Sequence, residues 1–284
     1  MSKKVILTAD STCDLGEELK ARYNVFYYPL HIILDGKDYL DNVDITPSEI
    51  FQAYYDKKIL PKTAAVNIGE YQEFFKKFTD EGCEVVHINL GSALSSSHKN
   101  AVLAAEELEG VYVVDSCNLS TGIGHIVIKA GQLIEQGLSG AEVAEQVRGM
   151  TGKVHSSFIL DTLKFMAAGG RCSTVVALGA NLLNLKPCIH VNNADGSMSV
   201  GKKYRGKLDK VLEQYVEEEL AKYDNIDDGT IFITHSGIDK SYVELVRKTV
   251  ERVHPFKEYH ETITSCTISC HCGPNTLGIL FMTK

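Results

Sequence analysis

The first half of the chain alternates between short apolar runs and longer amphipathic stretches. The apolar runs predict buried strands, and the stretches between them predict helices that begin near residues 15, 47, 67, 94, 120 and 140. The predicted strands are residues 4–9, 25–34, 84–90 and 111–114. Strands that alternate with helices in this way favour a mostly parallel sheet with helices on both faces.

Two of the predicted helices carry clear start signals. Thr46-Pro47-Ser48-Glu49 is a capping box with proline at the first helical position, and Asn67 followed by Glu70 repeats the box. The first box predicts a helix that runs to about residue 57.

The pattern changes after residue 153. A linker at 148–153 precedes a strand at 156–160 and two helical stretches that are separated by residues 169–173. Asn193-Ala194-Asp195-Gly196 is a turn signal and predicts a hairpin. Further strands and helices follow, at 187–191, 198–204, 207–223, 230–235, 239–253, 257–264 and 276–282. We therefore expect an α/β protein of two lobes: residues 1–153 with a mostly parallel sheet, and residues 154–284 as an α+β lobe with a mixed sheet.

Composition narrows the classes of function. The chain has 284 residues and a formal net charge of −8, with no block of consecutive lysine or arginine. Readers of nucleic acid present a basic face, so we expect no nucleic acid partner. The N-terminal segment lacks the features of a signal peptide, and no apolar stretch is long enough to span a membrane. These features predict a cytoplasmic protein with at most transient membrane contact.

Two segments resemble a phosphate-binding loop and a zinc site, but each lacks residues or spacing that such a site requires. Residues 196–203 nearly match a phosphate-binding loop, but they end in Lys203 where a hydroxyl residue is required, and they follow a hairpin turn. Cys266, Cys270 and Cys272 lack the paired spacing of structural zinc sites, and on a strand Cys270 and Cys272 would face away from His271. We therefore expect no metal site.

Two aspartates, Asp10 and Asp14, stand four residues apart at the end of the first strand. They could bind a metal, which would suit a phosphotransferase or a dihydroxyacetone-kinase-like enzyme acting on a small ligand. The simpler interpretation is a polar turn in which they cap the helix that starts at Leu15, and we favour it.

Neutral hydrogen-bond donors gather in loops of the first half. Polar segments occupy residues 10–14, 61–67, 91–97 and 115–121, at strand ends or in comparable loops. Thr63 lies in the second, and Ser92 and Ser95 in the third. Because ligands bind at the carboxyl ends of parallel strands, and helix N-termini attract anions, this arrangement is typical of a site for an anionic head group.

The second half adds cationic candidates. Arg171 follows two glycines, Arg205 ends a basic strand, and His271 lies in a predicted turn near the terminus. Glycines beside Arg171 would permit close approach of the backbone.

Ordered motifs along nearly the whole chain resemble the DegV family, the fatty-acid-binding subunits of bacterial fatty acid kinase systems. They are Asp10-Ser11-Thr12-Cys13-Asp14-Leu15, Pro61-Lys62-Thr63, Ser92-Ala93-Leu94-Ser95, Val114-Asp115-Ser116, Gly169-Gly170-Arg171-Cys172-Ser173, Leu185-Lys186-Pro187, Asp195-Gly196, Lys203-Tyr204-Arg205-Gly206-Lys207 and His271-Cys272-Gly273-Pro274.

The resemblance implies a long acyl tail between two lobes and a non-enzymatic carrier without a cofactor of its own. It implies that Thr63, with Ser92 or Ser95, holds the carboxyl group. It also implies that Arg171, Arg205 and His271 lie where a kinase subunit docks and converts the acid to an acyl phosphate. The chain departs from the family pattern at Ala64-Ala65-Val66-Asn67 and at Gly91, in the region of the head group.

Overall fold

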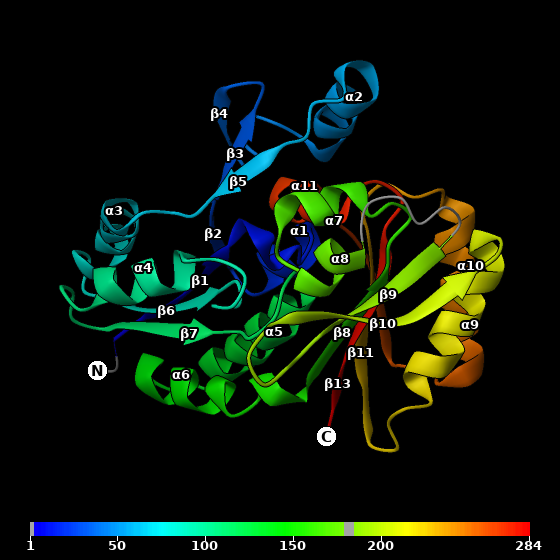
Figure 1. Cartoon of the computed structure of the whole chain (residues 1–284). Helices are drawn as coiled ribbons and strands as arrows, with labels where there is room; N and C mark the ends of the chain where they lie inside the picture. The colour runs from blue at the N-terminus through cyan, green and yellow to red at the C-terminus, as the bar shows by residue number, and fades with distance from the viewer. Residues whose placement is uncertain (1–2, 179–184) are drawn as a thin grey trace.

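Four parallel strands form the sheet of the first half. The computed structural model describes residues 3–178 and 185–284. In spatial order the strands are β2 (Phe26–Tyr28), β1 (Val5–Asp10), β6 (Glu84–Asn89) and β7 (Val111–Asp115). Helices α3 (Ile68–Thr79) and α4 (Ser97–Ala105) cover one face, while α5 (Thr121–Glu135) and α6 (Gly140–Arg148) cover the other (Figure 1). The capping boxes at Thr46 and Asn67 are confirmed.

The second half supplies a six-stranded mixed sheet. Its order is β10 (Met198–Arg205), β9 (Leu185–Val191), β8 (Val154–Ile159), β13 (Leu277–Thr283), β11 (Ile226–His235) and β12 (Glu258–Ile263). Among the described strand pairs of this second sheet, only β11–β12 is parallel. Helices α9 (Leu208–Leu220) and α10 (Lys240–Val253) pack on the outer face, and α5 lies between this sheet and the first one (Figure 1). The predicted fold class is therefore confirmed.

Six further helices of the described residues are short. They are η1 (Ser11–Cys13), α1 (Glu17–Arg22), η2 (Thr151–Lys153), α7 (Lys164–Gly169), α8 (Ser173–Leu178) and α11 (Cys266–Cys272). Helices α7 and α8 correspond to the two predicted helical stretches, and the continuation of the second beyond residue 178 lies outside the described residues. Helix α11 corrects the prediction for His271, which lies in its last turn and not in a loop.

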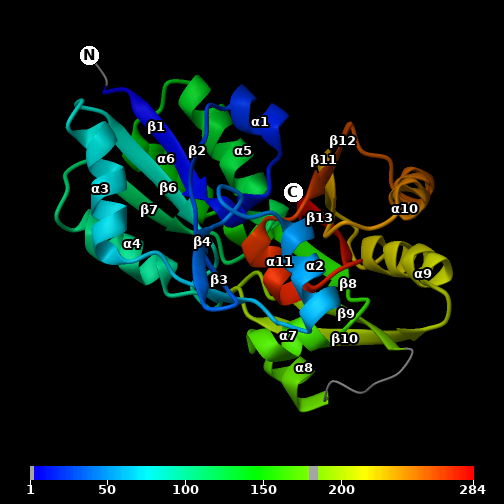
Figure 2. The same cartoon turned by 90° about the horizontal axis from the view of Figure 1, so that it is seen from above.

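A third, three-stranded antiparallel sheet was not predicted. The expected strand 25–34 divides at Pro29, which has no N–H to continue a ladder. Residues Phe26–Tyr28 pair with β1, whereas β3 (His31–Leu34) leaves the first sheet and pairs with β4 (Lys37–Leu40) and β5 (Lys62–Ala64). Helix α2 (Pro47–Lys57) completes this subdomain, which stands above the sheets next to α11 and α7 (Figures 1 and 2).

This subdomain packs on the second half of the chain. Ile32, Ile50 and Phe51 form one apolar cluster with Phe165 of α7 and with Cys266 of α11. The larger core likewise draws on both halves, because α5 is buried against both sheets. The division into 1–153 and 154–284 stays a prediction, and the two parts meet over an extensive apolar contact.

Candidate ligand-binding site

A cavity of about 120 Å³ lies where the two larger sheets, α11 and the end of β5 come together. A single buried water needs roughly 10–15 Å³ of such space, so the cavity has room for an organic molecule. Its walls are mainly apolar and come from both halves of the chain. The apolar lining residues are Leu30, Ala64, Ala65, Leu90, Leu94, Leu119, Phe158, Met166, Met198, Ile268 and Leu280.

One hydrogen bond between the two halves marks the polar part of the lining. Thr63 Oγ1 lies 2.9 Å from His271 Nε2, and both side chains line the cavity. Strand β5 holds Thr63 in an extended backbone, and α11 brings His271 across from the far end of the sequence. These two predicted residues, 208 positions apart in the chain, are therefore neighbours.

His271 is held as a neutral ring. Burial, together with the nearby charge of Arg171, lowers the pKa of His271 to about 4. Its Nδ1 is buried and has no hydrogen-bond partner among the described residues. A Cβ on Gly169 would lie 2.1 Å from this nitrogen, so the glycine is what allows the ring to approach the end of α7. Gly169 thus makes room for the histidine, and Gly170, with a φ of 69°, ends α7 next to Arg171.

Arg171 stands at the exposed edge of the same cavity. Its Nη1 donates to the carbonyl of Gly169 at 2.7 Å and its Nε donates to the carbonyl of Leu94 at 3.3 Å. These bonds hold the guanidinium between the end of α7 and the loop before α4. The arrangement places a permanent positive charge beside neutral hydroxyl groups.

The two candidate serines of the 91–97 loop separate in space. Ser95 lines the cavity with Ser96, and its Oγ lies 3.0 Å from Ser97 Oγ and accepts from the Ser97 N–H. Ser92 is exposed, and its N–H donates to Asp115 Oδ1. In the described part of the chain the cavity lining includes Ser95 but not Ser92.

Arg205 also lies away from the cavity. It ends β10 opposite Leu185, is exposed to solvent, and does not line the cavity formed by the described residues. The structure thus gathers Thr63, Ser95, Arg171 and His271 at one cavity and leaves Arg205 elsewhere on the surface.

Asp10 and Asp14 belong to two different buried networks. Asp10 accepts hydrogen bonds from the Tyr71 hydroxyl at 2.8 Å and from the Leu90 N–H at 2.8 Å. Asp14 accepts from Ser120 Oγ at 2.5 Å and from the Ser265 N–H at 2.7 Å. These donors occupy the oxygens that a shared metal ion would need.

The predicted cap at Asp14 is wrong. Helix α1 begins at Glu17 with Gly16 at its N-cap, and Asp14 makes no capping bond to it. The carboxyl group instead ties the end of η1 to the starts of α5 and α11. Burial raises the pKa of Asp14 to about 8.

Sequence reasoning missed most of the polar lining from the second half. Thr234, Thr264, Thr267 and Thr276 all face the cavity. They are spread over β11, α11 and the loops around it, and nothing in their local sequence distinguishes them from strand-end and capping threonines. Only the packing of the two halves reveals them.

Known proteins that are similar to this chain identify its family. The model of an uncharacterised protein family, DegV, matches residues 4–284. The chain belongs to the DegV family. DegV domain-containing proteins from Clostridium acetobutylicum and Clostridium perfringens are 29% and 30% identical to it, over 99% of this chain and 99% and 98% of theirs.

A solved DegV structure extends the likeness to three dimensions. A DegV family protein from Thermus thermophilus, described as binding fatty acid, is 28% identical, with a TM-score of 0.89 over 99% of this chain and all of that one. Among the described residues of this DegV protein, no helix is long and apolar enough to cross a membrane.

Proposed function

We propose that this DegV protein binds a long-chain fatty acid in the cavity between its two halves and presents the carboxyl group to a kinase subunit. The observation that carries the proposal is an apolar cavity whose polar lining gathers Thr63, Ser95, His271 and Arg171. The fatty acid bound by the Thermus thermophilus relative supports the choice of ligand.

The apolar walls would supply most of the affinity. Each buried methylene contributes roughly 0.8 kcal/mol, so an acyl tail of about sixteen carbons gains on the order of 10 kcal/mol. Leu119, Phe158 and Leu280 lie deep between the sheets, which makes them suitable contacts for such a tail.

Neutral hydroxyls would orient the head group. A neutral imidazole carries one N–H, and an unpaired buried N–H is rarer than an unpaired acceptor. The proton of His271 therefore belongs on Nε2, where it can donate to Thr63 Oγ1. The Thr63 hydroxyl hydrogen is then available for an oxygen of the ligand, and Ser95 offers a second hydroxyl. Carboxylates buried without a counterion are costly, so these donors suit a head group that stays near Arg171 and solvent.

Arg171 supports the presenting role. A kinase would transfer the γ-phosphoryl group of ATP to a carboxylate oxygen, with a new O–P bond and release of ADP. Guanidinium groups suit phosphate geometry, and Arg171 lies at the exposed edge of the cavity. In this proposal Arg205, exposed and away from the cavity, contributes to docking of the kinase subunit. The chain itself would be a carrier without a bound cofactor.

Binding is tested by mass spectrometry of the organic extract of purified protein. Wild type should yield about one long-chain fatty acid per chain. Thr63→Val keeps the side-chain shape but removes the hydroxyl, so the retained amount should fall several-fold. Thr79→Val, at the end of α3 and outside the cavity lining, is the matched control and should retain the wild-type amount. Extracts without fatty acid from folded wild type would refute the binding proposal.

Presentation is tested separately with a cognate kinase subunit, magnesium and labelled ATP. Arg171→Ala and Arg205→Ala should each lose at least ten-fold in acyl phosphate formation, and Arg205→Ala, which lies outside the cavity lining, should keep the bound lipid. Turnover of ATP by the wild-type chain without any kinase subunit would instead favour the alternative hypothesis, that the chain is itself a phosphotransferase. Loss of lipid with unchanged phosphoryl transfer would contradict the roles given to the arginines.

A further inference from the structure

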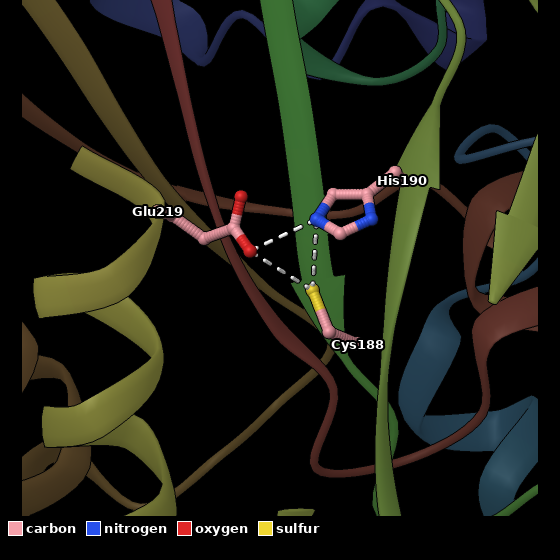
Figure 3. A group of neighbouring side chains, drawn as sticks. All are labelled: Cys188, His190 and Glu219. Atoms are coloured by element: carbon pink, nitrogen blue, oxygen red, sulfur yellow. Dashed lines mark hydrogen bonds and ion pairs between the residues drawn. The ribbon is translucent and has the colours of Figure 1, made fainter. Parts of the chain in front are cut away.

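A second cluster of reactive side chains lies on the outer face of the six-stranded sheet. Cys188 and His190 are two residues apart on β9 and therefore share one face. Glu219 reaches them from α9, which covers that face, and the three side chains point toward one another (Figure 3). Ile189, between them, faces the main core instead. The cluster is thus separated by the sheet from the cavity.

Two of the three distances between the ligand atoms match those of a tetrahedral metal centre. Cys188 Sγ lies 3.5 Å from His190 Nε2 and 3.6 Å from Glu219 Oε1, and these last two atoms are 2.9 Å apart. Zinc bonds of about 2.0–2.3 Å at tetrahedral angles place ligand atoms about 3.3–3.6 Å apart. Two of the three separations already fall in that range, and the third widens by about half an ångström when a cation replaces a hydrogen bond.

A positive charge already sits beside these atoms. Lys222 Nζ lies 2.7 Å from Glu219 Oε1 and 3.2 Å from His190 Nε2. Its side chain is 44% exposed, while that of Glu219 is 4% exposed. The nearly buried carboxylate is thus paired with His190 and with a lysine that can turn into solvent, and a metal ion can replace the charge of that lysine.

Strand β10 leaves space for the imidazole. A Cβ on Gly201 would lie 2.3 Å from Cε1 and 2.4 Å from Nδ1 of His190. Gly201 stands where the β9–β10 register shifts, between Val200 and Lys203. The missing side chain lets the ring lie against β10 with Nε2 turned to the cluster.

We propose that Cys188, His190 and Glu219 form a three-ligand site for a thiophilic divalent cation such as Zn²⁺. Thiolate, imidazole and carboxylate together suit zinc, and the part-exposed side of His190 leaves a fourth position for water. Binding forms a metal–sulfur bond and releases the thiol proton to solvent, while Lys222 turns outward as an ammonium. The sheet separates the site from the cavity, so it is independent of the fatty-acid proposal.

The test is titration of the full chain with Zn²⁺ after treatment with a chelator, in competition with a chromophoric chelator. One ion per chain should bind, and Co²⁺ should give a thiolate-to-metal charge-transfer band. Cys188→Ser should abolish the band, and His190→Ala should weaken Zn²⁺ binding at least ten-fold. Cys83→Ser, which alters a part-exposed thiol outside the cluster, should change neither. Lys222→Met should tighten binding by removing the competing ammonium.

Three results would overturn the proposal. They are absence of stoichiometric Zn²⁺ binding, a charge-transfer band that survives in Cys188→Ser, and equal affinity in wild type and His190→Ala. Unchanged or weaker binding by Lys222→Met would contradict the competing role of the lysine. Circular dichroism and thermal melting confirm folding of each variant; should Cys188→Ser not fold, the part-exposed His190→Ala carries the test.

Discussion

Asp14 illustrates how tertiary contacts redirect a single residue. Its sequence position favours a helix cap, but the fold buries the carboxyl between Ser120 and the N–H of Ser265. Burial outweighs these hydrogen bonds and raises its pKa to about 8. The folded state therefore favours the protonated form of Asp14. Its carboxyl group is bonded to Ser120, which lines the cavity.

This shift predicts a pH-dependent stability. The folded-state pKa of Asp14 lies above its ordinary value of 3.8, so the native state binds more protons than the unfolded state up to about pH 8. Stability should therefore fall as pH rises, by up to about 1.4 kcal/mol per pH unit. The lowered pKa values of His98, His125, His155 and His271 act in the opposite direction around and below pH 6.5, so comparison with a variant at position 14, and not the pH window alone, isolates Asp14.

Asp14→Asn mimics the protonated acid and should lack this component of the slope. Urea unfolding of wild type and variant at several values of pH between 6.5 and 8 measures the difference. Asp224→Asn, on an exposed aspartate, is the control and should keep the wild-type slope. Parallel curves for wild type and Asp14→Asn would show that the carboxyl does not titrate in this window.

At the scale of elements, α11 depends on the rest of the fold. It has seven residues, too few for an isolated helix to be stable in water. Ser265 caps it, and Asp41 accepts from the N–H groups of Cys266 and Thr267 at 2.8 and 3.2 Å. A carboxyl of the first half thus holds the N-terminus of the helix that carries His271.

Asp41→Ala should therefore destabilise the protein by about 2–4 kcal/mol, because it removes hydrogen bonds to a buried carboxyl and leaves buried N–H groups unpaired. Urea unfolding measures the loss, and limited proteolysis should show faster cleavage within residues 31–64. Asp80→Ala, at an exposed helix end, should change stability by less than about 0.5 kcal/mol. An equally small change for Asp41→Ala would mean that packing alone holds α11.

At the scale of the whole molecule, the proposed binding of a fatty acid in the apolar cavity predicts that affinity depends on tail length. Each methylene of a bound tail contributes roughly 0.8 kcal/mol, about a four-fold change in dissociation constant. Delipidated protein should therefore melt at a higher temperature as saturated fatty acids lengthen, until the tail fills the cavity. Matched fatty alcohols serve as the control for the head group. Equal shifts from butyric and palmitic acid would contradict a buried tail.

The sequence by itself determined the local elements and the class of fold. Capping at Thr46 and Asn67, the hairpin turn at 193–196 and the alternation of strands and helices depend on neighbours within a few residues, and each was predicted correctly. Ordered motifs also indicated the DegV family, because they recur in sequence whatever their distance in space.

Only the tertiary structure decided how these pieces share one site. In the folded chain Thr63 contacts His271, and Ser95 but not Ser92 lines the cavity. Arg205 lies on the surface, outside the cavity lining. The tertiary structure also turned residues 31–64 into a subdomain packed on α11, and made a helix of the predicted turn. Such contacts arise because apolar surface is buried between distant segments. The local pattern of apolar and polar residues determines helices and strands, but it does not specify which distant segments pack together.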